Sequence, residues 1–147
     1  MGLISEVGGG PVALDTSVFI YFIEEHERFL PVVGPLFEAM DRGTLRAVTS
    51  GLTLMEVLVL PYRRGDRKLA ESYEALLTRA RGLHLVELST GLLRTAAELR
   101  AELAVKTPDA IQLAAALHGG CSLFVTNERR LPELPELGVR QLSDYVD

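Results

Sequence analysis

Short apolar runs alternate with longer helical patterns along most of this chain. Five runs have the length and composition of buried strands, and they cover residues 12–14, 46–49, 84–88, 122–125 and 139–142. Strands that alternate with helical segments in this way are typical of a parallel sheet covered by helices. The pattern therefore predicts an α/β fold.

Two amphipathic helices follow from the spacing of apolar residues. Leucines, alanines and one tyrosine recur at helical spacing between Leu69 and Ala80, and the same pattern returns between Leu92 and Leu103. Each segment has one apolar face, so each helix is expected to cover the sheet.

A third helix carries boundary signals at both ends. Thr107 is the expected N-cap, Pro108 suits the first helical position, and Gly119 and Gly120 follow the last turn. The body of this segment is apolar nearly all round, which predicts a buried helix.

Only the first ten residues stand outside this organisation. They show no periodicity and end in three glycines, so residues 1–10 are expected to be a flexible extension. A length of 147 residues suits one domain. We therefore expect a single domain over residues 11–147.

Composition narrows the class of protein. Hydrophobic residues make up 48% of the chain and charged residues 24%, as in ordinary globular proteins. Cys121 is the only cysteine, so no internal disulfide can form, and this favours a reducing compartment. No apolar run approaches the ~18 residues that span a membrane, and no export signal is recognisable. A cytoplasmic protein is expected.

Charge and histidine content exclude two further classes. The formal net charge of -5 argues against non-specific coating of nucleic acid, although a local basic surface can still attract an anionic substrate. The three histidines are scattered and lie near no cysteine at metal-ligand spacing, which argues against a zinc site.

Four acidic residues follow strands or begin helices. Asp15 comes directly after the first strand, Glu56 lies in an otherwise apolar helix after the second, and Asp109 opens the buried helix. Thr126, Asn127 and Glu128 follow the fourth strand in that order. Ligands of open parallel sheets bind beyond the carboxyl ends of the strands, so these side chains are expected to converge there.

Each carboxylate also has a purely structural explanation. Asp15 suits the end of a strand and the start of a helix. Thr53 and Glu56 fit the capping-box pattern. Asp109 complements a helix dipole, and Glu128 suits an exposed turn.

Considered together, the acidic residues favour a metal site. Leu54, Met55, Val57 and Leu58 surround Glu56, and the helix of Asp109 has almost no polar face. Several like charges near one another in a buried setting are costly without a counter-cation. Oxygen ligands favour a hard ion, which here means Mg²⁺ or Mn²⁺.

Four segments in order resemble one known family. They are ALDTSVFIYFIE, TSGLTLMEVLVLP, TPDAIQLAAAL and LFVTNERRL. Together they resemble the PIN domain, and most closely the bacterial PIN proteins of the VapC toxin type. The similarity runs from about Val12 to about Leu142.

The resemblance implies a fold and an activity. The implied fold is a three-layer α/β/α sandwich with a central, mainly parallel sheet. The implied activity is metal-dependent endoribonuclease cleavage, in which a metal-activated water attacks a phosphodiester and leaves a 5′-phosphate and a 3′-hydroxyl.

The matched positions imply which residues act. Asp15, Glu56 and Asp109 match the acidic residues of the family, whereas Glu128 stands where the family usually has Asp. The expectation is one firm metal site on Asp15 and Asp109, with Glu56 bound directly or through water, and a weaker second site near Glu128. Side chains expected to orient these carboxylates or to touch phosphate are Thr16, Ser17, Thr126 and Asn127.

The same resemblance implies partners. VapC-type proteins act on RNA, pair with an antitoxin and usually form homodimers. Arg129 and Arg130 follow the proposed site and are candidates for RNA contact. The cluster Arg63, Arg64, Arg67 and Lys68 suits either RNA contact or a solvated helix face.

Three other interpretations account for some of these residues. A receiver domain also has acidic residues at strand ends, but it needs a lysine after a late strand, and Lys68 and Lys106 are not placed there. A PIN-fold RNA-processing nuclease outside a toxin–antitoxin pair stays open. So does a catalytically silent PIN-like binding module, although Asp15 and Asp109 are both present.

Overall fold

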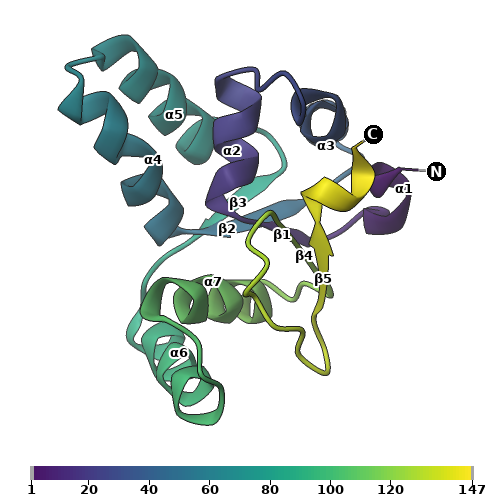
Figure 1. The fold of residues 1–147 in the computed structure, drawn as a ribbon, viewed down its shortest axis with the longest axis vertical. Helices are drawn as coiled ribbons and strands as arrows, with labels where there is room; N and C mark the ends of the chain where they lie inside the picture. Colours follow the sequence, from purple (N-terminus) through teal and green to yellow (C-terminus); the bar gives the residue numbers. More distant parts are fainter. Residues whose placement is uncertain (1, 147) are drawn as a thin grey trace.

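The centre of the molecule is a five-stranded parallel sheet (Figure 1). The computed structural model describes residues 2–146. Its strands are β1 (Val12–Leu14), β2 (Ala47–Ser50), β3 (Leu83–Val86), β4 (Leu123–Thr126) and β5 (Gly138–Gln141). They lie in the order β3-β2-β1-β4-β5, and every neighbouring pair is parallel. The predicted parallel α/β sheet is confirmed, with each strand within two residues of its expected place.

Helices cover both faces of this sheet. The helices are α1 (Leu3–Val7), α2 (Thr16–Ile23), α3 (Leu30–Asp41), α4 (Gly51–Arg63), α5 (Arg67–Arg79), α6 (Thr90–Glu102) and α7 (Thr107–His118), with a final 3-10 turn, η1 (Leu142–Tyr145). Figure 1 shows α2, α3 and α5 above the sheet and α6 and α7 below it. The expected three-layer α/β/α arrangement is confirmed.

The central strand β1 shows how the two cores form. Val12 and Leu14 pack into the core shared with α2, α3 and α5, whereas Ala13 faces the core under α6 and α7. Successive side chains of a strand point to opposite faces, so both cores draw on one three-residue segment. All three side chains are buried, which places the end of β1 firmly within the fold.

The N-terminal segment differs from the expected flexible extension. Residues Leu3–Val7 form α1, and the Leu3 side chain is only 2% exposed. Glu6 accepts hydrogen bonds from Arg140 Nε at 2.9 Å and from Tyr145 Oη at 2.6 Å. A five-residue helix has too few apolar positions to show a period, which is why the sequence pattern missed it.

The buried helix α7 is confirmed, with its start shifted by one residue. Thr107 is the first helical residue rather than the N-cap, and Lys106 precedes it. At the other end, a Cβ on Gly119 would lie 2.8 Å from Val48 Cγ1, so the helix ends where only glycine fits against β2. Within residues 2–146, no helix combines the length and hydropathy needed to cross a membrane.

Candidate active site

A cleft of about 470 Å³ opens at the carboxyl edge of the sheet. Its walls come from the start of α2, the middle of α4, the first turn of α7 and the loop after β4. All four acidic residues of interest line it: Asp15, Glu56, Asp109 and Glu128. The parallel sheet brings them together because β1 and β4 end side by side and the helices that follow β1 and β2 start at the same edge.

Asp15 is the most constrained of these carboxylates. It is the N-cap of α2, and its Oδ1 accepts a hydrogen bond from Thr16 N at 2.8 Å. Its Oδ2 accepts from Thr126 Oγ1 at 2.6 Å. Burial raises the pKa of Asp15, and the charges of Glu56 and Asp109 raise it further, while the two hydrogen bonds lower it. Asp15 therefore caps a helix and also faces two like charges.

Glu56 is held from a different direction. Its Oε1 accepts a hydrogen bond from Thr16 Oγ1 at 2.5 Å. The capping-box alternative does not apply, because Ser50 is the N-cap of α4 and Thr53 is buried in contact with Thr49 and Gln112. Glu56 thus points toward the cleft and plays no capping role.

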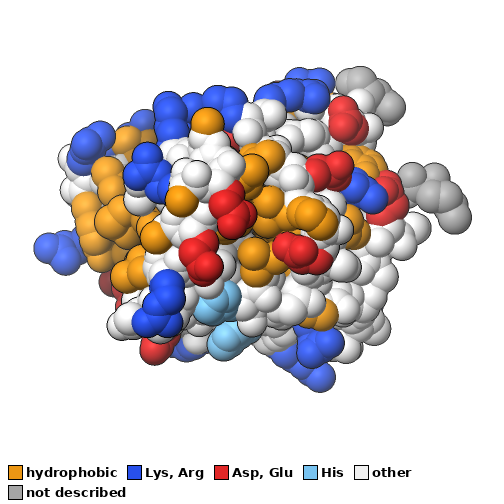
Figure 2. All heavy atoms as spheres, turned by 90° about the horizontal axis from the view of Figure 1, so that it is seen from below, with side chains coloured by type: hydrophobic (Ala, Val, Ile, Leu, Met, Phe, Trp, Pro, Cys, Tyr) orange, Lys and Arg blue, Asp and Glu red, His pale blue; other side chains and the backbone are white. Residues whose placement is uncertain are grey.

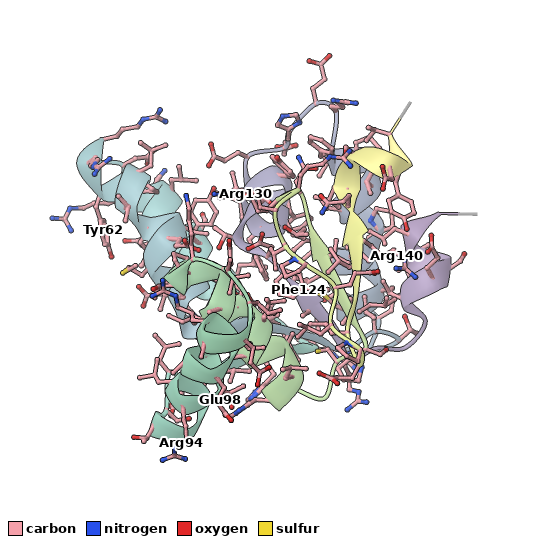
Figure 3. All side chains as sticks on the ribbon, turned by 60° about the horizontal axis from the view of Figure 1, so that its bottom comes forward. Tyr62, Arg94, Glu98, Phe124, Arg130 and Arg140 are labelled. Atoms are coloured by element: carbon pink, nitrogen blue, oxygen red, sulfur yellow. The ribbon has the colours of Figure 1, made fainter. Side chains whose placement is uncertain are left out.

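Asp109 and Glu128 both line the cleft, and the charge of Arg130 acts on both. Burial raises the pKa of Asp109, the charge of Arg130 lowers it, and that of Glu128 raises it. Arg130 binds Glu128 through Nε and one terminal nitrogen, both at 3.0 Å. These hydrogen bonds hold the pKa of Glu128 below its ordinary value. Arg130, labelled in Figure 3, lies on the loop that follows β4.

Some of the predicted polar and basic residues line the cleft, and Arg129 does not. Ser17 and Asn127 line the cleft, and Ser17 Oγ is buried with no hydrogen-bond partner within residues 2–146. Arg130 also lines the cleft, whereas Arg129 turns away to Ser143 and Asp144 at 2.5 and 3.7 Å. Of the two arginines named as RNA contacts, the fold therefore presents only Arg130 to the site.

Three residues of the site escaped the sequence pattern. Lys106 and Tyr21 line the cleft, and Tyr21 Oη accepts a hydrogen bond from Asn127 Nδ2 at 3.1 Å. Gln112 lies beneath the cleft, where its amide reaches Thr16 and Thr53. Gln112 alone carried a signal, because a polar side chain is unusual in a helix that is apolar nearly all round.

The amino-acid sequence matches the model of one protein family. The match is to the PIN domain, and it covers residues 12–137. This chain belongs to the PIN domain family. No curated protein sequence matches the chain.

Solved structures share the PIN fold of this chain. VapBC bound to DNA from Salmonella typhimurium superposes with a TM-score of 0.69 at 22% identity, over 89% of this chain and 97% of that chain. VapBC2 from Rickettsia felis, bound to a promoter DNA fragment, gives 0.67 at 18% identity, over 92% and 98%. VapC20 from Mycobacterium tuberculosis, a toxin that cleaves the sarcin-ricin loop, gives 0.61 at 17% identity, over 77% and 86%.

PIN domains are nucleases that generally use divalent metal ions. Asp15, Glu56 and Asp109 form no ion pair with another of residues 2–146, although the charges of Arg130 and Lys106 act on Asp109 from beyond ion-pair distance. All the donor atoms are oxygens, which suits a hard divalent cation. In the described part of the chain no three acidic, histidine or cysteine side chains are close enough to hold an ion as they stand. The chemistry of this donor set fits such an ion.

Asp15→Asn is expected to stabilise the metal-free protein at neutral pH. The folded-state pKa of Asp15 lies above its ordinary value of 3.8, so ionisation costs more in the folded protein than in the unfolded chain. The gain in unfolding free energy should therefore be present at pH 7, fade as the pH falls through the raised folded-state pKa, and be gone below about 4. Urea unfolding across this pH range, with a chelator present, measures it.

Glu128→Gln is the matched comparison, because its expected sign is opposite. The pKa of Glu128 is lowered by Arg130, so losing its charge should reduce stability at pH 7. A gain from Asp15→Asn that is equally large at pH 3 would show that burial of the charge is not its cause.

Proposed function

We propose that this protein is a metal-dependent endoribonuclease and the toxin of a type II toxin–antitoxin pair. The observation that carries the proposal is the cleft that gathers Asp15, Glu56 and Asp109, none of which forms an ion pair among residues 2–146. Such crowding is costly unless a cation compensates it. The presence of all these acidic residues in a PIN domain favours a catalytic protein over a catalytically silent binding module.

The residues that would hold the ion are Asp15, Glu56 and Asp109. A bound Mg²⁺ or Mn²⁺ supplies an activated water and stabilises charge that develops on the phosphate. Thr126 and the Thr16 backbone hold the Asp15 carboxylate in one orientation, and the Thr16 hydroxyl does the same for Glu56. Preorganised ligands of this kind lose little freedom when an ion binds.

Glu128 has a different role in this proposal. Its carboxylate is engaged by Arg130 on both oxygens, so an ion must compete with the guanidinium for it. We therefore assign Glu128 to a weaker second site that fills at high metal concentration or when a substrate phosphate engages Arg130. Mg²⁺ suits such a site because it keeps several waters.

Basic side chains at the rim provide for an anionic substrate. Lys106 and Arg130 both line the cleft, and the charge of each lowers the pKa of Asp109. Positive charge beside a cleft attracts phosphate groups and positions them without reading the base sequence. RNA is the substrate that fits this arrangement together with the PIN assignment.

The toxin assignment draws on the structural neighbours. These neighbours include VapBC and FitAB assemblies and a toxin–antitoxin complex from Klebsiella pneumoniae. We propose a cognate antitoxin for this chain by analogy, acting with it in the cytoplasm, where the lone Cys121 stays reduced. A PIN-fold RNA-processing nuclease without an antitoxin is the alternative, and growth of the expressing cells separates the two.

A homodimer is the second part of the proposal. Large hydrophobic side chains that are exposed within residues 2–146 all lie on α4 or near the start of α6: Met55, Val59, Leu60, Tyr62, Leu88 and Leu93. The two segments adjoin, since a Cβ on Gly51 would lie 3.8 Å from Leu88 Cγ. Figure 2 shows hydrophobic side chains gathered on the side that carries α4, and Figure 3 shows Tyr62 pointing outward from that helix. In a two-fold symmetric dimer, this surface of one subunit packs against the same surface of the other, so both exposed apolar patches become buried.

Asp15→Asn and Asp109→Asn should each reduce RNA cleavage more than about 100-fold, because each removes a charged metal ligand. Cleavage of a labelled RNA with Mg²⁺ or Mn²⁺, and again after chelation, measures this. Expression of the wild type should slow growth, and Asp15→Asn should relieve the effect.

Glu98→Gln is the control, because Glu98 is exposed on α6, away from the cleft (Figure 3). Full cleavage by either aspartate variant, in a preparation free of other ribonucleases, would contradict the assignment. Cleavage without growth arrest would favour the RNA-processing alternative.

Arg130→Ala should weaken RNA binding and lower its salt dependence by about one phosphate contact. Arg129→Ala is the matched control, since Arg129 contacts Ser143 and Asp144 instead of the cleft. RNA affinity is measured at several salt concentrations with chelator, so that no cleavage occurs. Equal salt slopes for wild type and Arg130→Ala would remove Arg130 from the substrate site.

The double variant Met55→Lys/Val59→Lys should convert a dimer to a monomer. Both side chains are exposed on one face of α4, and four charges across a two-fold contact would repel one another. Sedimentation equilibrium should give twice the 16.1 kDa chain mass for the wild type and once for the variant. Ser72→Lys, at an exposed position of α5, is the control, and a wild type that sediments as a monomer would contradict the proposal.

A further inference from the structure

A buried polar cluster lies directly beneath the acidic cleft. Its centre is Gln112, only 4% exposed in the otherwise apolar body of α7. Ser50 and Thr53, both fully buried, lie on its β2–α4 side, and Thr16 lies toward the cleft. Gln112 follows Asp109 by three residues, so the two side chains share one face of the helix.

The donors of this cluster can be assigned in only one consistent way. Thr49 Oγ1 donates its only hydroxyl proton to Leu14 O at 2.8 Å. In the 2.7 Å hydrogen bond between Thr49 and Thr53, Thr53 must therefore be the donor. Thr53 must then accept from Gln112 Nε2, at 3.0 Å. Ser50 Oγ, which donates to Gln112 Oε1 at 3.0 Å, fixes the amide in the same orientation.

That orientation reaches the cleft through Thr16. Gln112 Nε2 also lies 3.4 Å from Thr16 Oγ1, where it is placed to donate its second proton. Because Thr16 Oγ1 accepts this amide proton, its own hydroxyl proton is available to donate to Glu56 Oε1, 2.5 Å away. The cluster therefore sets the direction of the hydrogen bond that holds Glu56.

We propose that Gln112 is a positioning residue, which orients the Thr16 hydroxyl and thereby holds the Glu56 carboxylate ready for a divalent cation. The inference rests on the proposed metal-dependent function and extends it to a residue outside the cleft. Partners of metal ligands orient them and raise metal affinity. A purely structural role would instead satisfy Ser50 and Thr53 and have no effect on cation binding.

Gln112→Met tests the inference because it keeps the side-chain length and removes the amide. We expect Mn²⁺ affinity, measured by calorimetry without RNA, to fall about tenfold. Thr49→Val is the matched control: it removes hydrogen bonds from the same buried cluster, but Thr49 makes no hydrogen bond to Thr16 and Ser50 still fixes the Gln112 amide. Both variants should lose stability in urea, and only Gln112→Met should lose Mn²⁺ affinity.

A double-variant cycle shows whether the effect passes through Thr16. Thr16→Val should weaken Mn²⁺ binding, Thr16→Ser should restore it, and Gln112→Met should add little in the Thr16→Val background. If Gln112→Met does not fold, Ser50→Ala releases the same amide from its anchor and should weaken Mn²⁺ binding in the same direction.

The possible failures are distinguishable. A wild type that binds no Mn²⁺ would overturn the proposed metal-dependent function. If Gln112→Met binds Mn²⁺ as tightly as the wild type does, only the positioning role is overturned. The same holds for Ser50→Ala if that variant is used. Equal losses for Gln112→Met and Thr49→Val, or full additivity with Thr16→Val, would assign Gln112 to stability alone.

Discussion

Repulsion among carboxylates at the carboxyl edge of the sheet is the constraint on which the site depends. Asp15 cannot move away from Glu56 and Asp109, because it follows a strand buried on both faces and caps the helix after it. Glu56 and Asp109 are anchored by helices that pack on the same sheet. The two cores that stabilise the fold therefore also hold like charges together, which favours the binding of a cation.

The surrounding polar groups orient these charges without neutralising them. Asp15 and Glu56 receive hydrogen bonds from threonines, whereas the positive charges of Lys106 and Arg130 lie at the rim. Arg130 is engaged with Glu128, so it does not cancel the charge of Asp15 or Glu56. Neutral donors at the centre and cations at the edge suit a site that takes a metal ion inside and a phosphate outside.

Strand and helix positions could be predicted from the sequence because each depends on local periodicity. The five apolar runs became β1–β5, and the apolar segment after Lys106 became α7. The sequence pattern did not predict α1, because Leu3 and Val7 are buried by packing against elements far away in the sequence. The Thr53–Glu56 spacing was misleading, since a capping box also requires Thr53 at the helix start and the chain places Ser50 there.

The sequence by itself determined the α/β class, the PIN resemblance and the acidic residues that end up at one edge, because a parallel sheet puts the carboxyl ends of its strands together. Only the tertiary structure decided which partners these residues have. Arg129 and Arg130 are neighbours in sequence, yet one turns to Ser143 and the other to Glu128. Gln112 meets Thr16 across 96 positions of the chain. Contacts of that separation follow from how whole elements pack, and no local pattern records them.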